Sequence, residues 1–321
     1  MIELTVYAIP FFILMMGVEI LAFRREAQEA REEDAARAAA GHPAYVGYEA
    51  RDTRTSLTMG VGSLVVNAFW HLVLIAVWAA AYELTPLRMD AGDWWIWPLL
   101  FFADDLAYYT YHRVGHEVRV FWASHVVHHS SEHYNLSTAL RQPWVPLTMP
   151  FWLPLALLGY KPWMILLAQS WSLIYQFGLH TERIGKLPRP IEFLFNTPSH
   201  HRVHHGANEI YLDRNYGGIL IIWDRLFGSF QGETERVRYG LTTNIRTFSP
   251  MKVLTHEYEA IWHDVRSTPK WRDRLGYLLR GPGWRPGMAD ASAHAAIVAA
   301  AAEGPALAPA GAPVGASAGT P

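Results

Sequence analysis

Three tight groups of histidine are the feature of this chain with the clearest chemical meaning. They read H-x-x-x-H from His112 to His116, H-x-x-H-H from His125 to His129, and H-H-x-x-H-H from His200 to His205. Spacings of three and four residues place side chains on one face of a helix. Neutral imidazole is a common ligand of zinc, copper, iron and nickel. Because about four to six ligands fill the shell of one ion, so many imidazoles predict two metal ions close together.

The candidate metal ligands are the histidines that share a helical face within these groups, together with one further histidine. That further residue, His180, ends an apolar run that would return it to the same side as the groups. The complete set is His112, His116, His125, His128, His129, His180, His201, His204 and His205. The i, i+3, i+4 pattern leaves out His200, which we expect beside the ligands or on the substrate side. Isolated histidines such as His263 and His294 are expected to be ordinary structural or surface residues.

Two acidic residues lie at helical spacing from candidate ligands. Asp105 is seven residues before His112, so its carboxylate could accept a hydrogen bond from a ligand's ring N–H. The alternative for Asp105 is a polar contact between helices. Glu132 is seven residues after His125 and could orient that ring. The glycine-containing turn at residues 213–218 is expected to brace the third histidine group rather than to act in catalysis.

The composition excludes several classes of protein and of metal site. No cysteine occurs among the 321 residues, so disulfides, cysteine zinc sites, iron–sulfur clusters and thiolate haem are all excluded. Nitrogen and oxygen must therefore hold any metal. The net charge is −2 and the pI about 6.8, so no basic excess recruits nucleic acid. The charged fraction of 17% is below the ~25% of soluble domains.

Five apolar runs predict an all-α integral membrane protein. They cover residues 4–23, 57–82, 94–111, 144–158 and 163–179. The first is long enough to cross a bilayer and lacks the basic start of a cleaved signal. The last two are short and separated by a turn at residues 159–162, which indicates a hairpin. We therefore expect about four to five membrane-inserted helices below a cytosolic helical cap that carries the metal site.

The positive charges predict the orientation of these runs. Arg24 and Arg25 follow the first run, so the positive-inside rule places the N-terminus outside. Alternation then puts every histidine group and the C-terminus on the cytosolic side. Residues 1–286 are expected to form one membrane-embedded domain, with its core motifs in residues 94–230. Residues 287–321 are rich in Ala, Pro and Gly and are expected to be a disordered tail.

Together, the histidine groups resemble the signature of the fatty acid hydroxylase/sterol desaturase superfamily, which are membrane di-iron enzymes with eight conserved histidines. The connecting strings resemble its alkylglycerol monooxygenase branch. These strings are HHSSE at 128–132, YNLSTALRQ at 134–142, TPSHHRVHHG at 197–206, and the stretch from NYGG at 215–218 to WDRLFG at 223–228. The resemblance covers roughly residues 94–230. His133 stands where an acidic residue is expected, which leaves the role of that position open.

This resemblance implies an O₂-dependent hydroxylase that uses two iron ions and takes a lipid from the bilayer. It also implies an external electron donor, which in this branch is tetrahydrobiopterin. Glu117 corresponds by position to a functional acid of the branch, although by its sequence alone it is a solvated helix charge. Iron is also preferred to zinc on chemical grounds, because zinc has no redox chemistry with which to attack an unactivated C–H bond.

Two alternatives stay open at this point. Within the same superfamily, the enzyme could be a carotenoid or sterol-ring hydroxylase or desaturase, because the sequence does not specify the lipid. In another class, the chain could be a membrane metal transporter. Transporters usually bind their substrate near the bilayer midplane on broken helices. The present histidines gather at predicted helix ends on one side, which favours an enzyme.

Overall fold

The structure is a computed structural model, and it describes residues 4–29, 47–145 and 147–288. Throughout these ranges the regular elements are helices, and the β-pairing is confined to one bridge between Phe195 and Leu220. The all-α prediction is therefore confirmed for this part of the chain. Nearly all of the predicted tail, residues 289–321, lies outside the described residues, as do residues 30–46.

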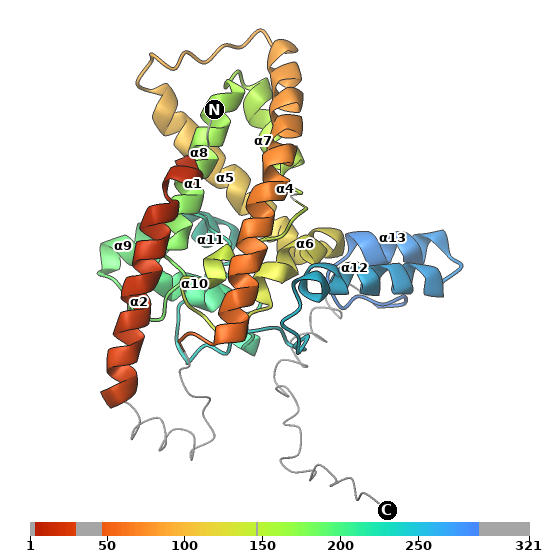
Figure 1. Cartoon of the computed structure of the whole chain (residues 1–321). Coiled ribbons are helices and arrows are strands. Elements are labelled where there is room, and N and C mark those ends of the chain that lie inside the picture. Colours follow the sequence, from red (N-terminus) through yellow and green to blue (C-terminus); the bar gives the residue numbers. More distant parts are fainter. Residues whose placement is uncertain (1–3, 30–46, 146, 289–321) are drawn as a thin grey trace, which may run out of the picture.

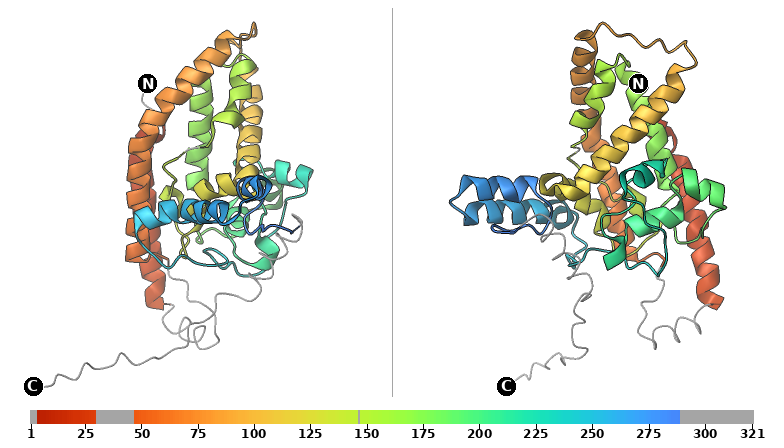
Figure 2. Two further views of the ribbon diagram at one scale, coloured as in Figure 1. Left: turned by 90° about the vertical axis from the view of Figure 1, so that its right-hand side faces the viewer. Right: turned by 180° about the vertical axis from the view of Figure 1, so that it is seen from behind.

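The helices divide into an upright set, a lower set and a lateral pair (Figure 1). The upright set contains α4 (Ala50–Glu83), α5 (Ile96–Glu117), α7 (Met149–Leu157) and α8 (Pro162–Phe177), flanked by α1 (Leu4–Tyr7) and α2 (Ile9–Glu29). The lower set contains α6 (Arg119–His129), η1 (Thr138–Leu140), α9 (Arg189–Leu194), α10 (Pro198–His204), η2 (Glu209–Tyr211) and α11 (Ile222–Phe227). The lateral pair, α12 (Pro250–Ser267) and α13 (Trp271–Leu279), projects sideways in two of the views (Figures 1 and 2).

Helix α4 is long and apolar enough to cross a membrane, and it alone passes that test among the described helices. It begins at Glu49, whose carboxylate accepts a hydrogen bond from the amide N–H of Asp52 at 2.6 Å. Its outer surface exposes Val61, Val65 and Phe69, each by more than 60%. A continuous exposed apolar surface of this kind is typical of contact with lipid. The predicted number of four to five inserted helices is not confirmed, because α7 and α8 have 9 and 16 residues.

The upright helices share an apolar core that fixes α5 against α7 and α8. Trp78, Leu100 and Ile165 are each at most 1% exposed in this core. Asp104 of α5 accepts a hydrogen bond from the indole N–H of Trp152 at 2.7 Å, which satisfies a buried carboxylate inside it. Helix α5 is therefore a rigid support for the histidines at its lower end.

A single extended residue separates α5 from α6. Val118 has φ −122° and ψ 117°, so the helix stops there and the chain changes direction. The next residue, Arg119, donates its backbone N–H to the carbonyl of Arg280 at 2.9 Å. This break lets α6 cross below the upright helices with its own histidines facing those of α5.

Candidate metal centre

The structure brings all nine predicted ligands together, in two groups. The first group contains His112, His116, His125, His129 and His204, and the second contains His128, His180, His201 and His205. Within each group, one candidate ligand atom per residue lies within 4.8 Å of all the others. Every one of the nine side chains is buried, with at most 8% exposed. The donors thus divide into sets of five and four, which is the arrangement that two metal sites would need.

Four segments supply these histidines. Helix α5 and helix α6 give the first two sequence clusters, the end of α8 leads to His180, and α10 gives the third cluster. The neighbours His128 and His129 belong to different groups, and so do His204 and His205. Adjacent residues on a helix point about 100° apart, so α6 and α10 each lie between the two groups.

Main-chain carbonyls orient three of the rings. His112 donates its Nδ1–H to the carbonyl of Tyr216 at 2.8 Å, and His204 donates to that of Arg214 at 3.0 Å. His180 donates in the same way to Gln176 at 2.8 Å. A carbonyl can only accept, so Nδ1 holds the proton and Nε2 presents a lone pair to the centre.

The loop that carries two of these carbonyls is held in an uncommon conformation. Asp213 and Asn215 have φ values of 56° and 57°, in the left-handed region that Asp and Asn tolerate better than most residues. The Asn215 side chain donates to the carbonyl of His200 and accepts from the amide of Gln231. Asp224 accepts the next two amides, of Tyr216 and Gly217. The prediction that this segment braces the third histidine group is confirmed.

Asp105 supports this loop rather than a histidine, and its predicted bond to a ligand ring was wrong. Its carboxylate accepts from the amides of Ile219 and Leu220 at 2.7 and 3.1 Å and from the indole of Trp223 at 2.8 Å. Gly218 makes the approach possible, since a Cβ there would lie 2.7 Å from a ring carbon of Tyr108. All three of these donors come from the loop and the start of α11, and none is a histidine ring.

The spacing argument for Glu132 also fails. Helix α6 ends at His129 and is capped at Ser130, so the seven-residue relation to His125 is not helical. The Glu132 side chain is exposed, and its Cγ lies next to Gly240. Sequence periodicity placed Glu132 on a helix that stops three residues earlier.

Glu117 and His200 lie outside both groups. Glu117 is exposed by 47% and accepts a hydrogen bond from Arg113 at 2.9 Å. Arg113 also donates to the hydroxyl of Tyr109. His200, which the spacing had left out, has its Nε2 2.9 Å from a carboxylate oxygen of Glu192.

The environment lowers the pKa of eight of the nine histidines and so favours their neutral form. Burial lowers the pKa of His112 to about 3, with a further lowering by neighbouring His116. Burial likewise lowers the pKa of His180 to about 4. Burial, followed by the nearby imidazoles, lowers the pKa well below its usual range for six more ligands: His125, His128, His129, His201, His204 and His205. Neutral imidazole is the form that binds metal.

The geometry of the first group fits a bound cation. Four Nε2 atoms form a row of close approaches. Nε2 of His125 lies 2.9 Å from that of His112 and 3.0 Å from that of His129. Nε2 of His129 lies 3.1 Å from that of His204. The Nε2 atoms at the two ends of this row present lone pairs, because His112 and His204 carry their protons on Nδ1. No placement of protons on the two middle rings satisfies all three approaches. A metal ion, which accepts every lone pair, removes this conflict.

Two buried nitrogens support the same fit. Nε2 of His116 in the first group and Nε2 of His205 in the second are buried, and neither has a hydrogen-bond partner among the described residues. Unpartnered buried polar atoms are rare and costly. An all-imidazole set suits iron, copper, nickel or zinc better than magnesium or calcium, which prefer oxygen.

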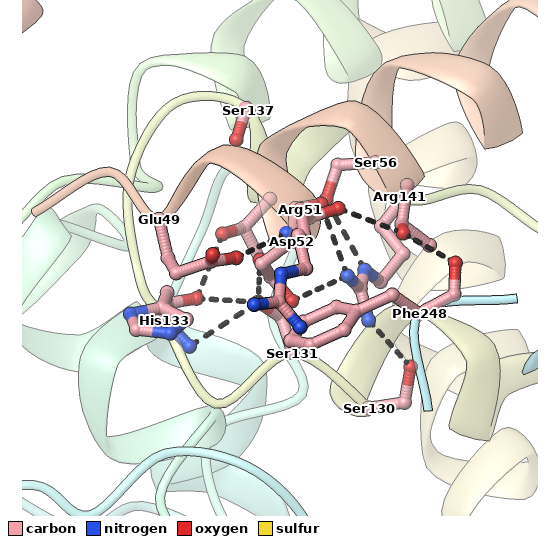
Figure 3. A network of polar contacts seen from close by, with 12 residues as sticks. Glu49, Arg51, Asp52, Ser56, Ser130, Ser131, His133, Ser137, Arg141 and Phe248 are labelled. Carbon is pink, nitrogen blue, oxygen red and sulfur yellow. Dashed lines mark hydrogen bonds and ion pairs between the residues drawn. The ribbon is translucent and has the colours of Figure 1, made fainter. Parts of the chain in front are cut away.

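A buried ion pair fixes the far end of α6, and the sequence analysis did not find it. The Arg141 guanidinium lies 2.5 Å from an Asp52 carboxylate oxygen, with 1% and 4% of the two side chains exposed. Arg141 also donates to Ser56 and to Ser130, both at 3.1 Å. Ser131 Oγ lies 2.6 Å from the second carboxylate oxygen of Asp52 (Figure 3). The residues directly after His129 are therefore attached to the first turn of α4.

Comparison with known proteins identifies the domain that this centre occupies. Residues 97–229 match the family model described as fatty acid hydroxylase. This stretch is therefore similar to a fatty acid hydroxylase domain. It contains all nine histidines of the two groups, together with Asp105, Glu117 and Arg141. Asp52, the partner of Arg141, lies outside the matched region.

Curated relatives extend the similarity beyond this domain. The chain is 44% identical over 242 residues to alkylglycerol monooxygenase of Homo sapiens and 41% identical over 244 residues to that of Danio rerio. Each match covers 74% of this chain and 53% of the relative, so the chain spans about half the length of these proteins. An ornithine lipid hydroxylase of Rhizobium tropici is 30% identical over 152 residues, which is 42% of this chain and 43% of that protein. No solved structure matches.

Proposed function

We propose that this protein is a membrane-bound, O₂-dependent lipid monooxygenase with two iron ions. The observation that carries the proposal is the pair of adjacent buried histidine groups, with five and four nitrogen donors, inside a fatty acid hydroxylase domain. The nine proposed ligands are those named above. Iron bound there would supply the redox chemistry that O₂ activation and C–H oxidation require, which zinc lacks.

The protein's own residues would orient and protect this chemistry. The carbonyls of Tyr216, Arg214 and Gln176 hold three rings with Nε2 toward the metal sites. Burial of the ligands excludes bulk water, which protects reactive species from side reactions. Asp105 and Asp224 hold the loop that bears two of the carbonyls, and we assign them a positioning role.

The substrate is proposed to be a lipid that enters from the bilayer. The names of the matched relatives, which act on alkylglycerols and on an ornithine lipid, support this substrate class. The apolar hairpin formed by α7 and α8 would line the entry. Trp152 of α7 is buried in the core of the upright helices, and Phe177 at the end of α8 is buried against Leu136. We further propose that α4 spans the membrane and that the histidines lie on its cytosolic side, at the lower end of the upright helices (Figure 1).

The electron donor is proposed to be external, with tetrahydrobiopterin as the first candidate. Glu117 remains our candidate for contact with the donor or with a bound water, because it is exposed and directly follows the ligand His116.

Metal analysis and O₂ consumption on purified protein test this function. We expect close to two irons per chain, and lipid-dependent O₂ consumption with a reductant. A panel of ether lipid, ornithine lipid, carotenoid and sterol separates the substrate alternatives. Pterin, ferredoxin and a cytochrome separate the donors. One metal per chain in active protein would contradict the two-metal site. Iron-loaded protein that oxidises no lipid with any donor, yet moves metal into vesicles, would establish the transporter instead.

A further inference from the structure

The lateral hairpin of α12 and α13 lies outside the matched domain and is firmly attached to the metal-bearing helix α6. Arg119 at the start of α6 donates to Glu257 at 2.7 Å and to Asp264 at 2.6 Å, both on α12. Val253 of α12 packs in a buried cluster with Met59 of α4 and Val127 of α6. The hairpin therefore has a fixed position, and it extends across the direction of α4 (Figures 1 and 2).

One face of α12 carries a stripe of four residues whose two ends, Met251 and Trp262, are exposed apolar side chains. Met251, Thr255, Tyr258 and Trp262 follow one another at i, i+4, i+7 and i+11, which is one side of a helix. Met251 is 57% exposed and Trp262 is 61% exposed. Between these ends, Thr255 and Tyr258 are partly buried and line a cavity with Ser124 of α6. The fully buried residues of α12 are Val253 and Ile261.

The stripe is continuous with the apolar surface of α4. Met251, Thr255 and Tyr258 line a cavity of about 210 Å³ whose lining also includes Trp144. Trp144 also lines a second hollow, together with Leu57 and other residues of α4. The apolar surface thus passes from α12 across Trp144 to the helix that is long enough to span a membrane.

The hairpin meets α4 at the level where the exposed apolar stretch of α4 begins. Thr55 donates its hydroxyl to the carbonyl of Phe248 at 2.8 Å, just before α12 starts. Exposed apolar residues of α4 begin at Leu57 and continue through Val65 and Phe69. A bilayer around α4 would therefore have its surface at the height of α12.

The charge and the second helix fit the same location. Residues 250–288 contain seven Lys or Arg and four Asp or Glu, a net charge of +3 in a chain whose total is −2. Helix α13 exposes Trp271, Leu275 and Leu279, at four-residue spacing, by 64%, 44% and 57%. Exposed tryptophans beside basic residues are typical of helices that lie in the membrane interface.

We propose that α12 and α13 form an interfacial hairpin that lies on an anionic lipid surface, with the α12 stripe dipping into the acyl boundary. This proposal rests on the proposed membrane location of α4. The partner is the bilayer itself, and the basic residues would contact its headgroups. Through Arg119 and Val253, the hairpin holds α6 at a fixed height relative to the bilayer from which the substrate comes.

The absence of native cysteine makes a direct depth measurement possible. Single variants of the full chain in anionic proteoliposomes would carry a nitroxide label. Collision with O₂, which concentrates in the bilayer, is compared with collision with a water-soluble nickel chelate. Two matched pairs are neighbours in sequence but lie on different faces of α12: Met251→Cys with Lys252→Cys, and Trp262→Cys with His263→Cys. Phe69→Cys on α4 is the bilayer reference.

We expect Met251→Cys and Trp262→Cys to show an O₂-to-nickel ratio several-fold higher than their partners, approaching that of Phe69→Cys. Neutral lipid should reduce the contrast within each pair. Equal ratios within both pairs, with Phe69→Cys still in the bilayer, would overturn the interfacial hairpin and leave the proposed function intact. Nickel access at Phe69→Cys would overturn the membrane location and the hairpin together.

Discussion

Replacing Arg141 by methionine would test how the structure positions the ligands at the end of α6. The substitution removes a guanidinium that is 1% exposed and leaves the Asp52 carboxylate, 4% exposed, without its charged partner. It also removes donors to Ser56 and Ser130. Breaking a buried ion pair in this way costs about 3–5 kcal/mol of folding free energy. We therefore expect a large fall in stability toward denaturant in detergent.

A double variant distinguishes the cost of burying an unpaired charge from the loss of ligand positioning. Asp52→Leu combined with Arg141→Met removes both charges, and replacement of a buried pair by apolar residues is often close to neutral. The double variant should recover about 2 kcal/mol or more relative to the sum of the single changes. Ser130 and Ser131 would still lose their attachment to α4. We expect bound metal and turnover to stay low even where stability is restored.

Arg119→Met provides the matched control. Arg119 is a 5%-exposed arginine at the other end of the same helix, paired with Glu257 and Asp264. Arg119→Met should lower the free energy of unfolding by a similar amount yet leave bound metal near two per chain. Metal content by elemental analysis and the absorption spectrum of the cobalt(II)-loaded protein report the sites independently of activity. If Arg119→Met and Arg141→Met lose metal equally, or if the double variant regains full metal, the positioning argument is wrong.

Four further outcomes follow from the site. His128→Ala should lower bound metal and abolish turnover, whereas His263→Ala, whose side chain is 84% exposed, should change neither; equal losses would mean that the ligand set is misassigned. Asn215→Ala should weaken metal binding by about 10–100-fold in competition titrations, since it frees the carbonyls that orient His112 and His204. Glu117→Gln should retain metal and change stability by less than about 1 kcal/mol, because its ion pair is exposed. It should nevertheless lose most turnover. Normal turnover would mean that Glu117 has no role beyond that of a surface charge. Removal of metal by a chelator should lower the melting temperature, and added iron should restore it, because metal bound only by the folded state stabilises that state.

The sequence predicted which histidines come together because helical spacing is a local property. His112 and His116, or His125 and His129, share a face through geometry that a single helix determines. The position of His180 beside these histidines was also predicted, because it follows from where an apolar helix ends. Residues whose role depends on a distant partner could not be found in this way.

Asp105 and Arg141 show where local reasoning stops. Asp105 has the correct helical spacing to His112, but a segment more than 110 residues later supplies its donors. Arg141 was noticed only within a string, since its partner Asp52 is 89 residues away. The periodicity that suggested Glu132 ignored the helix end at His129. Contacts between segments decide these roles, and a period within one segment carries no information about them.

Two pairs of consecutive residues, His128 with His129 and His204 with His205, divide their side chains between the two histidine groups. The separation of the groups is thus determined by the pitch of a helix instead of by flexible loops. An ion that binds in one group immobilises the backbone turn that presents ligands to the other. The second ion then loses less conformational entropy on binding, because part of its site is already ordered. The first ion therefore raises the affinity for the second. Loading should therefore be cooperative, with a steep titration and few half-filled molecules.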